Sequence, residues 1–152
     1  MSVVAVRDGM MAADTQASGG GIKFGMRKTA CQDGVAIGWA GTWVDGKTFA
    51  EWYFKGADIS SPPVYHGRHG DQDRADFAAI VLKPDSWEYW CEYLVPELST
   101  DIHMPFYAIG SGAQAALAAM HLGATAIEAV EVACKVADGC SLPIEHHVIG
   151  AA

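Results

Sequence analysis

The chain has 152 residues, of which 51% are hydrophobic and 18% are charged, and its formal net charge is −8 at neutral pH. This length suits one domain with a substantial core, and we expect residues 1–152 to form it. The composition excludes a disordered chain, and the negative charge argues against nucleic acid or an anionic membrane as a partner.

Two short strands joined by a tight turn are predicted at the start of the chain. The turn is Asp8-Gly9, because both central residues of a type I′ turn need positive φ and these residue types tolerate it. Antiparallel pairing then brings Asp14 close to Ser2. If Met1 is removed, Ser2 carries a nucleophilic hydroxyl and a free α-amine, whose reference pKa of about 7.7 to 8.0 suits a base. One residue would then supply both nucleophile and base.

Glycines organise the next part of the chain. The expected elements are a flexible turn at 17–21, an extended segment at 22–31, a hairpin turn at Asp33-Gly34 and a strand at 35–41. The first glycine run lacks the spacing and the final Lys-Ser/Thr of a phosphate-binding loop, so we interpret it as a turn. Glycines inside a strand usually mark close approach of another backbone or a ligand, and Gly38 and Gly41 are candidates for this.

The remainder of the chain alternates between helical and extended patterns. The expected elements are a helix at 42–55, a loop at 57–75, strands at 76–82 and 87–93 joined at Pro84-Asp85, a central strand at 106–109, helices at 113–122 and 126–137, and an edge strand within 143–149. Thr125 and Glu128 form a capping box at the start of the last helix, whose buried stripe we assign to Val130, Val132 and Val136. This order favours antiparallel sheets covered by helices over βαβ units.

The cysteines and histidines give no strong site pattern. The four cysteines are Cys31, Cys91, Cys134 and Cys140. No export signal or membrane-spanning run is visible, so we expect a cytoplasmic protein with buried free thiols. His66 and His69 lie in the long loop, and adjacent residues such as His146 and His147 point to opposite sides of an extended chain. We expect neither a metal nor a cofactor.

Several short motifs follow one another in the order and spacing of a known family. They are Ala13-Asp14-Thr15-Gln16, Arg27-Lys28, Gly38-Trp39-Ala40-Gly41-Thr42, and Tyr107-Ala108-Ile109-Gly110-Ser111-Gly112 before an alanine-rich helix. With these motifs the chain resembles the proteasome β-subunit and HslV-like family of N-terminal nucleophile hydrolases, over residues 2–56 and 77–142. The resemblance implies an α+β fold: a four-layer αββα sandwich whose active site opens at one end of the two sheets. The family's second helix would be replaced by the 57–75 loop.

The resemblance also implies catalytic roles for individual residues. Ser2 would be the nucleophile in place of the family's usual threonine. Lys28 would lower the pKa of the α-amine by repulsion between like charges, and Asp14 would orient Lys28. The Gly41 N–H would bind the oxyanion. Ser111 would hydrogen-bond near the terminal amine.

Further site residues are implied with less direct roles. Asp138 roughly matches the carboxylate that supports the serine near the amine. Trp39 and Trp43 fall where the family lines its specificity pocket, and two indoles would either narrow that pocket or favour contacts with flat groups. Thr15 and Gln16 complete the expected substrate-binding residues.

The expected function is therefore cleavage of peptide bonds, through an acyl-enzyme on Ser2, in peptides or unfolded proteins. By analogy with the family we expect a homo-oligomeric ring, and an ATP-dependent unfoldase is a possible partner. The alternative is an inactive proteasome-like subunit with a scaffold or assembly role.

Two other motif readings fail on the residues themselves. The segment from Gly110 to Ala115 fits the dinucleotide pattern GxGxxA, but a helix follows where a second strand with an acidic end is needed. A nucleophile elbow at Ser111 fails because Ile109 and Ala113 occupy the glycine positions of GxSxG.

Overall fold

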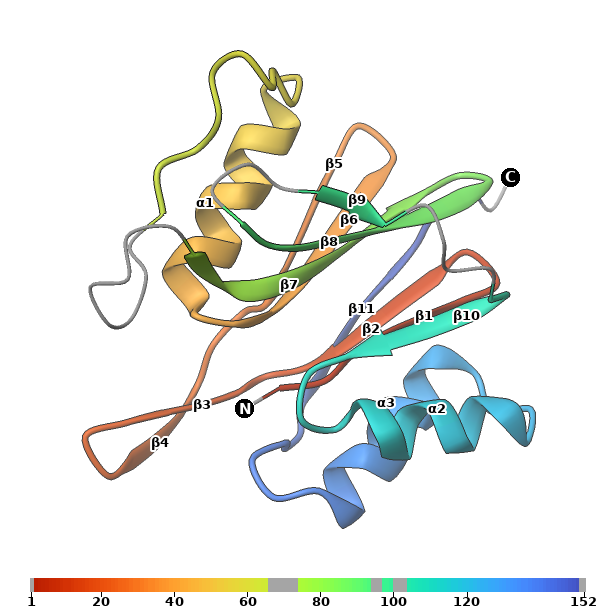
Figure 1. Cartoon of the computed structure of the whole chain (residues 1–152). Helices are drawn as coiled ribbons and strands as arrows, with labels where there is room; N and C mark the ends of the chain where they lie inside the picture. The colour runs from red at the N-terminus through yellow and green to blue at the C-terminus, as the bar shows by residue number, and fades with distance from the viewer. Residues whose placement is uncertain (1, 66–73, 94–96, 100–103, 151–152) are drawn as a thin grey trace.

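The computed structural model describes residues 2–65, 74–93, 97–99 and 104–150, which form four layers (Figure 1). Helix α1 (Trp43–Phe54) covers one sheet, and helices α2 (Ala113–His121) and α3 (Ala126–Val136) cover the other. The two sheets face each other in the middle. The predicted αββα sandwich is confirmed.

All strands pair antiparallel. The sheet next to α2 and α3 has the order β10-β1-β2-β11, from strands β1 (Val4–Arg7), β2 (Met10–Asp14), β10 (Phe106–Ile109) and β11 (Ile144–Val148). The sheet next to α1 has the order β5-β6-β7-β8-β9, from strands β5 (Thr29–Gln32), β6 (Val35–Gly41), β7 (Arg74–Lys83), β8 (Ser86–Tyr93) and β9 (Glu97–Ser99). A separate hairpin, β3 (Gln16–Gly19) with β4 (Ile22–Gly25), projects from the body (Figure 1).

Two Asp-Gly pairs make the predicted hairpin turns. Asp8 and Gly9 have φ values of 49° and 73°, and Asp33 and Gly34 have values of 50° and 75°. Four positive φ values at these positions are the signature of type I′ turns, which match the right-handed twist of the flanking strands. The first turn sets the register that places Asp14 opposite Val3, whose carbonyl accepts the Asp14 N–H at 3.2 Å.

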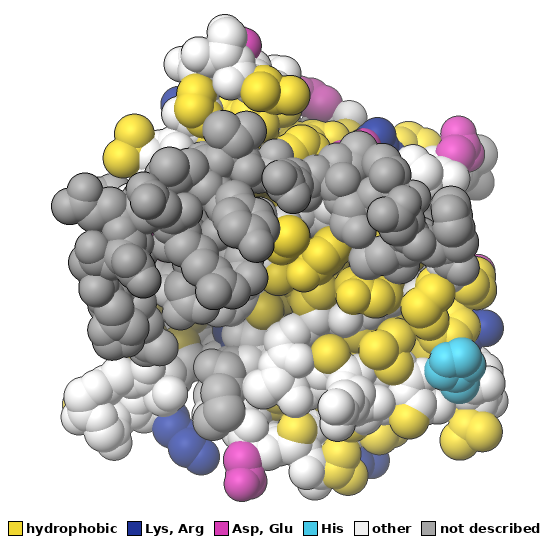
Figure 2. Space-filling view, viewed as in Figure 1, with side chains coloured by type: hydrophobic (Ala, Val, Ile, Leu, Met, Phe, Trp, Pro, Cys, Tyr) yellow, Lys and Arg dark blue, Asp and Glu magenta, His cyan; other side chains and the backbone are white. Residues whose placement is uncertain are grey.

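The core consists of three clusters of buried side chains, one at each interface between neighbouring layers. Along the extended segment from Val3 through β1, alternation sends Val3 and Ala5 toward helices α2 and α3, and Val4 and Val6 toward the opposite sheet. Gly38 has no side chain because the sheets approach closely there: a Cβ would lie 2.6 Å from Val4 Cγ1. Figure 2 shows hydrophobic side chains gathered between the two sheets on the face in view.

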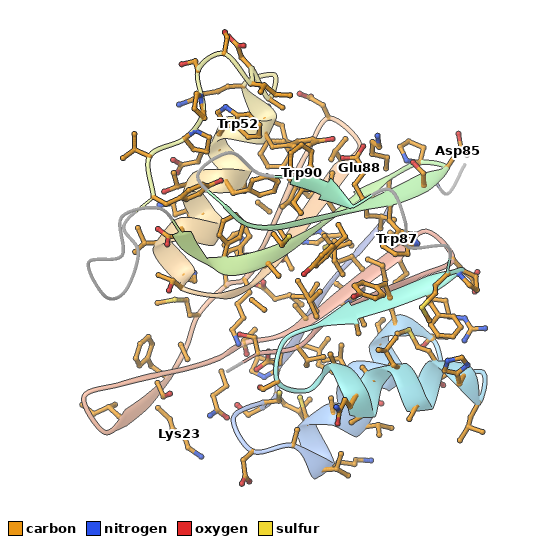
Figure 3. All side chains as sticks on the ribbon, viewed as in Figure 1. Lys23, Trp52, Asp85, Trp87, Glu88 and Trp90 are labelled. Carbon is orange, nitrogen blue, oxygen red and sulfur yellow. The ribbon has the colours of Figure 1, made fainter. Side chains whose placement is uncertain are left out.

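Aromatic side chains join α1 to its sheet. Phe49 is fully buried and lies 5.4 Å, centroid to centroid, from the ring of Trp90. Figure 3 shows Trp52 on α1 and Trp90 on the neighbouring sheet, and their rings meet edge to face at 6.0 Å. A glycine stands inside the helix at position 46 because the Trp39 ring occupies the space of its side chain, 2.1 Å from where a Cβ would be. The fit of Trp39 against the helix outweighs the roughly 1 kcal/mol helix cost of glycine.

Two sequence expectations about this fold are wrong, and one strand was missed. The 17–21 segment is not a plain turn, because its first part lies in β3 and only Gly20 and Gly21 turn the chain. The strand at 106–109 is the edge strand β10 and not a central one, and β9 was missed. The loop expected at 57–75 is confirmed at 57–65, which has no helix or strand, and it ends earlier than expected because β7 begins at Arg74. Residues 66–73, including His66 and His69, lie outside the described residues.

The buried stripe of α3 also differs from the expectation. Val130 is buried, but Val132 and Val136 are 38% and 69% exposed. The buried positions, spaced by three, four and seven residues, are Ala126, Ala129, Val130 and Ala133. The stripe follows small alanines because they let the helix approach the sheet closely, so residue size at the contact overrode hydrophobicity. The capping box of Thr125 and Glu128 is confirmed.

The expectation of four buried thiols is wrong for three of them. All four cysteines are free, but Cys31 is exposed, Cys91 and Cys134 are half-buried, and only Cys140 is buried. Cys31 lies in the edge strand β5, where burial decreases along the strand from the buried Thr29 to the exposed Cys31 and Gln32. Within the described part of the chain, no helix is long and apolar enough to cross a membrane.

Candidate active site

Ser2 is held at the start of β1 by the turn that leads into α2. It is only 5% exposed, its N–H donates to Ser111 Oγ at 3.2 Å, and its carbonyl accepts the Gly112 N–H at 3.2 Å. Gly110 has a φ of 95°, and a Cβ there would lie 2.1 Å from the Ser2 carbonyl oxygen. A glycine is therefore needed at Gly110 both for its backbone and for its closeness to Ser2.

Asp14 ends β2 and is fully buried beside Ser2. Each carboxylate oxygen accepts two hydrogen bonds. Oδ1 accepts the Val3 N–H and the Lys28 Nζ–H, both at 2.9 Å, and Oδ2 accepts the Gln16 and Ser141 N–H groups at 3.0 and 3.3 Å. A carboxylate has room for about four donors, so this buried charge is fully satisfied and can persist without water.

Lys28 is 4% exposed and forms an ion pair with Asp14. Its main chain is fixed by β6 and by the start of α1. The Trp39 N–H donates to the Lys28 carbonyl at 3.0 Å, and the indole Nε1–H of Trp43 donates to the carbonyl of Arg27 at 2.8 Å. The predicted pair of Asp14 and Lys28 is thus a buried ion pair, and not one on the surface.

A cavity of about 270 Å³ opens in front of these residues. It is lined by Ser2, Gln16, Ala17, Ser18, Phe24, Met26, Lys28, Trp39, Gly41, Thr42 and Trp43. The lining residues come from the start of the chain, the β3-β4 hairpin, the approach to β5, and the end of β6. Gly41 has a φ of 101°, a conformation that glycine adopts without strain.

A second, apolar cavity of about 220 Å³ adjoins the first along Trp39 and Trp43. The two indoles therefore lie between the cavity that contains Ser2 and the apolar cavity beneath α1. The Trp39 indole Nε1 is buried and has no hydrogen-bond partner among the described residues. The Lys47 ammonium lies over the Trp43 ring, 5.3 Å from the ring centroid, in a cation–π interaction.

The structure brings most of the predicted site residues together. Ser2, Lys28 and Gly41 share the cavity with Gln16, Trp39 and Trp43, while Asp14 and Ser111 contact Lys28 and Ser2 from behind. Such an arrangement places a hydroxyl, a buried ammonium group and a glycine backbone around one cavity, and acyl transfer at a carbonyl uses groups of these kinds.

Two predicted residues lie elsewhere. Thr15 is buried and is not among the cavity-lining residues: its hydroxyl donates to the carbonyl of Pro143 at 2.7 Å. Asp138 is exposed, and among the described residues it is not a hydrogen-bond partner of Ser111. Neither Thr15 nor Asp138 is therefore among the residues that line the cavity.

Sequence reasoning missed several residues around the site. Ser141 acts through its backbone, which no residue type reveals. Phe24 lines the cavity from the β3-β4 hairpin, which was not predicted, and Met26 lines it from the segment just after that hairpin. Cys140 hydrogen-bonds with Ser111, and the pKa of its thiol is raised, chiefly by burial and then by Asp14. The thiol is therefore kept protonated beside Ser111. No group of three His, Cys, Asp or Glu side chains suited to a metal ion occurs in the described ranges.

Comparisons with known proteins agree on the fold. No protein-family model matches the sequence, and no curated protein matches it significantly. The structure is similar to BPH of Thiobacillus denitrificans, solved in complex with epoxomicin, with a TM-score of 0.69 and 19% identity over 97% of each chain.

Two further solved structures are similar over most of their length. Eukaryotic HslV from Trypanosoma brucei has a TM-score of 0.66 and 17% identity over 97% of each chain. Anbu from Hyphomicrobium sp. strain MC1 has a TM-score of 0.62 and 13% identity over 97% of this chain and 81% of the other. The chain therefore has the HslV-like, proteasome-like fold that its motifs predict.

Proposed function

We propose that the protein is an N-terminal nucleophile hydrolase of the HslV-like proteasome family that cleaves peptide bonds through an acyl-enzyme on Ser2. One observation carries the proposal: Ser2, Lys28 and the Gly41 backbone line the same 270 Å³ cavity, with Asp14 buried behind Lys28. A buried lysine paired with a fully satisfied carboxylate is costly to maintain, and such groups concentrate at functional sites.

The proposed reaction needs Met1 to be removed. The free Ser2 amine takes the proton of Oγ as Oγ attacks the peptide carbonyl, and the Gly41 N–H stabilises the oxyanion. The tetrahedral intermediate collapses as the amine passes that proton to the leaving nitrogen, which releases the C-terminal product and leaves an ester on Oγ. Water, activated by the same amine, then hydrolyses the ester and restores the Ser2 hydroxyl. The Lys28 ammonium stabilises negative charge at Oγ throughout.

The substrate class and the assembly are proposed from the family resemblance. An open cavity flanked by the projecting β3-β4 hairpin suits an extended peptide segment better than a folded protein. We propose peptides or unfolded proteins as substrates, a homo-oligomeric ring in the cytoplasm, and an ATP-dependent unfoldase as a partner that supplies unfolded chains.

The first test is the intact mass of the purified protein followed by hydrolysis of fluorogenic peptide amides. We expect a mass without Met1 and measurable turnover. Ser2→Ala should abolish turnover and leave the far-UV circular dichroism spectrum unchanged, while Ser2→Thr should keep turnover because it retains the hydroxyl. Turnover that survives Ser2→Ala would exclude the mechanism.

A bifunctional inhibitor tests the nucleophile and the base together. A peptide epoxyketone can take the Ser2 oxygen at its ketone and the Ser2 amine at its epoxide. We expect a covalent adduct on the N-terminal residue, located by tandem mass spectrometry and missing from Ser2→Ala. Epoxomicin, with which BPH was solved in complex, is such an epoxyketone and is the probe we would use.

A specific observation favours a second candidate function, that of an inactive subunit with a scaffold role. The exposed Asp138 does not meet Ser111, so the carboxylate expected to support the site is out of place. This candidate predicts a large assembly by light scattering together with retained Met1, no peptide turnover and no inhibitor adduct. Turnover lost in Ser2→Ala would exclude it.

A further inference from the structure

Strand β11 presents two polar side chains to the opposite sheet. Glu145 pairs with Ala13 and His147 with Met11, and these partners both face the other sheet. Alternation along the strand therefore sends Glu145 and His147 across the gap between the sheets, while His146 points the other way and is exposed.

Both side chains meet one hydroxyl on the opposite sheet. Thr29 begins β5 and is 2% exposed. Its Oγ1 lies 3.0 Å from Glu145 Oε2 and 2.9 Å from His147 Nε2. A hydroxyl has only one proton, and an ionised carboxylate can only accept, so Thr29 donates to Glu145. His147 must then donate from Nε2–H to Thr29, which fixes the ring tautomer.

The Glu145 carboxylate also binds Arg27, the residue that precedes Lys28. Arg27 Nε donates to Glu145 Oε1 at 2.8 Å. Glu145 thus uses one oxygen for the residue before Lys28 and the other oxygen for the residue after it. The Arg27 side chain is 79% exposed, whereas Thr29 is buried. Of the two contacts of Glu145, the one with Thr29 is therefore the one shielded from solvent.

The contacts of Glu145 and His147 lie beside Lys28, which itself spans the two sheets. The Lys28 main chain belongs to the sheet under α1, because its carbonyl is bound by the Trp39 N–H, but its side chain binds Asp14 on the other sheet. The Lys28 ammonium can meet Asp14 only if the two sheets keep their spacing at this edge. Glu145 and His147 connect the sheets at the residues on either side of Lys28.

We propose that Glu145 and His147 are positioning residues that set the placement of Lys28 in the active site through Arg27 and Thr29. This inference rests on the proposed function, in which the Lys28 ammonium stabilises charge at Ser2. Neither residue lines the 270 Å³ cavity, so they act through Lys28 and not by contact with substrate. A small displacement of a catalytic group costs rate while it leaves substrate binding intact.

A matched pair of variants at Thr29 tests the proposal. Thr29→Val keeps the shape of the side chain and removes the hydroxyl, and Thr29→Ser keeps the hydroxyl. We expect Thr29→Val to lower kcat by about 10-fold or more with KM within about 2-fold, and Thr29→Ser to stay near wild type. Asp8→Asn, a change to an exposed carboxylate at the other end of β1, is the control and should change neither constant.

Equal kcat values for the two Thr29 variants would overturn the proposal, as would a rise in KM alone. Glu145→Gln keeps an oxygen for the Thr29 hydroxyl and loses the ion pair with the exposed Arg27. We expect its kcat to fall less than that of Thr29→Val. A larger fall would show that the Arg27 pair, and not Thr29, carries the effect, which would contradict the role given to His147.

A measurement without turnover separates this proposal from the proposed function. The ¹⁵N signal of the Lys28 ammonium reports its hydrogen exchange, which the buried ion pair with Asp14 slows. We expect exchange to be about 10-fold faster in Thr29→Val and unchanged in Thr29→Ser and Asp8→Asn. This result would support the positioning role even if Ser2→Ala showed that Ser2 is not the nucleophile. Unchanged exchange in Thr29→Val would overturn it even in an active enzyme.

Discussion

The two ends of the sheet sandwich both carry a cavity, but they are built from different groups. At the end where β1 starts, the 270 Å³ cavity has a buried serine and a buried lysine in its wall. At the other end, a larger cavity of about 490 Å³ lies between the Asp8-Gly9 turn and the β7-β8 turn. Its charged residues are Asp8, Lys83 and Asp85, and both aspartates are exposed.

The difference lies in the polar groups and not in the volume. At the first end, Asp14 is fully buried and its carboxylate accepts four hydrogen bonds, three from backbone N–H groups and one from Lys28. At the second end, Lys83 forms an ion pair with Glu88 in which the lysine is 37% exposed, and Trp87 stacks on Tyr107 at 5.2 Å. Buried charge that is fully satisfied indicates a site better than cavity size does.

The largest expected effect concerns the two lysines. Lys28→Met should lower the free energy of unfolding by about 3 kcal/mol, because it leaves the buried Asp14 carboxylate without its cation, and it should abolish turnover. Lys83→Met, at the other end, should cost less than about 1 kcal/mol, because the ammonium is partly exposed. Urea unfolding of both variants measures the contrast, and equal losses would contradict it.

The next largest effect on stability is expected from alanine substitution at two glycines whose backbone φ values are similar. Gly110 and Gly123 have φ values of 95° and 102°, but a Cβ meets the Ser2 carbonyl only at Gly110 and meets nothing within 4 Å at Gly123. Gly123→Ala should cost about 1 kcal/mol through backbone strain and leave turnover intact. Gly110→Ala should cost more and lower turnover, because Ser2 must move. Thermal unfolding and peptide hydrolysis check both changes, and matching behaviour would show that Ser2 is not held by this turn.

A smaller effect on stability is expected from pH, through His147 near the candidate active site. The pKa of His147 is lowered, first by burial and then by His146 and Arg27, while Glu145 acts in the opposite direction. A depressed histidine pKa means that the unfolded chain binds the proton more readily. Stability should therefore fall as the pH drops through the ordinary histidine pKa of about 6.5 toward the folded value. His147→Gln should flatten this part of the urea-midpoint profile, and an unaltered profile would exclude His147 as its source.

The smallest effect is expected from the larger cavity. Asp85→Asn removes an exposed charge at the β7-β8 turn, where Figure 3 shows Asp85 at the far end of the sandwich. We expect a change in stability within about 0.5 kcal/mol and unchanged turnover. A clear loss of peptide hydrolysis would mean that the two ends are functionally connected.

The sequence by itself determined the local elements whose signals are short in range. The Asp-Gly turns, the capping box of Thr125 and the helix stop before Gly56 depend on residues within a few positions of one another, so a single chain segment contains all the information needed. The order of Ser2, Asp14, Lys28 and Gly41 was also visible, because motif spacing survives without knowledge of the fold.

Only the tertiary structure decided which of those residues meet and which do not. Thr15 and Asp138 matched the motif in sequence, yet the packing of strand ends and loops placed them outside the cavity. The exposed faces of Val132 and Val136 depend on how closely α3 approaches the sheet, which residue hydrophobicity does not specify. The link from Glu145 and His147 to Thr29 joins residues 116 and 118 positions apart, on different sheets. Such contacts arise from the spacing between layers, and the spacing is fixed by the packing of the whole core.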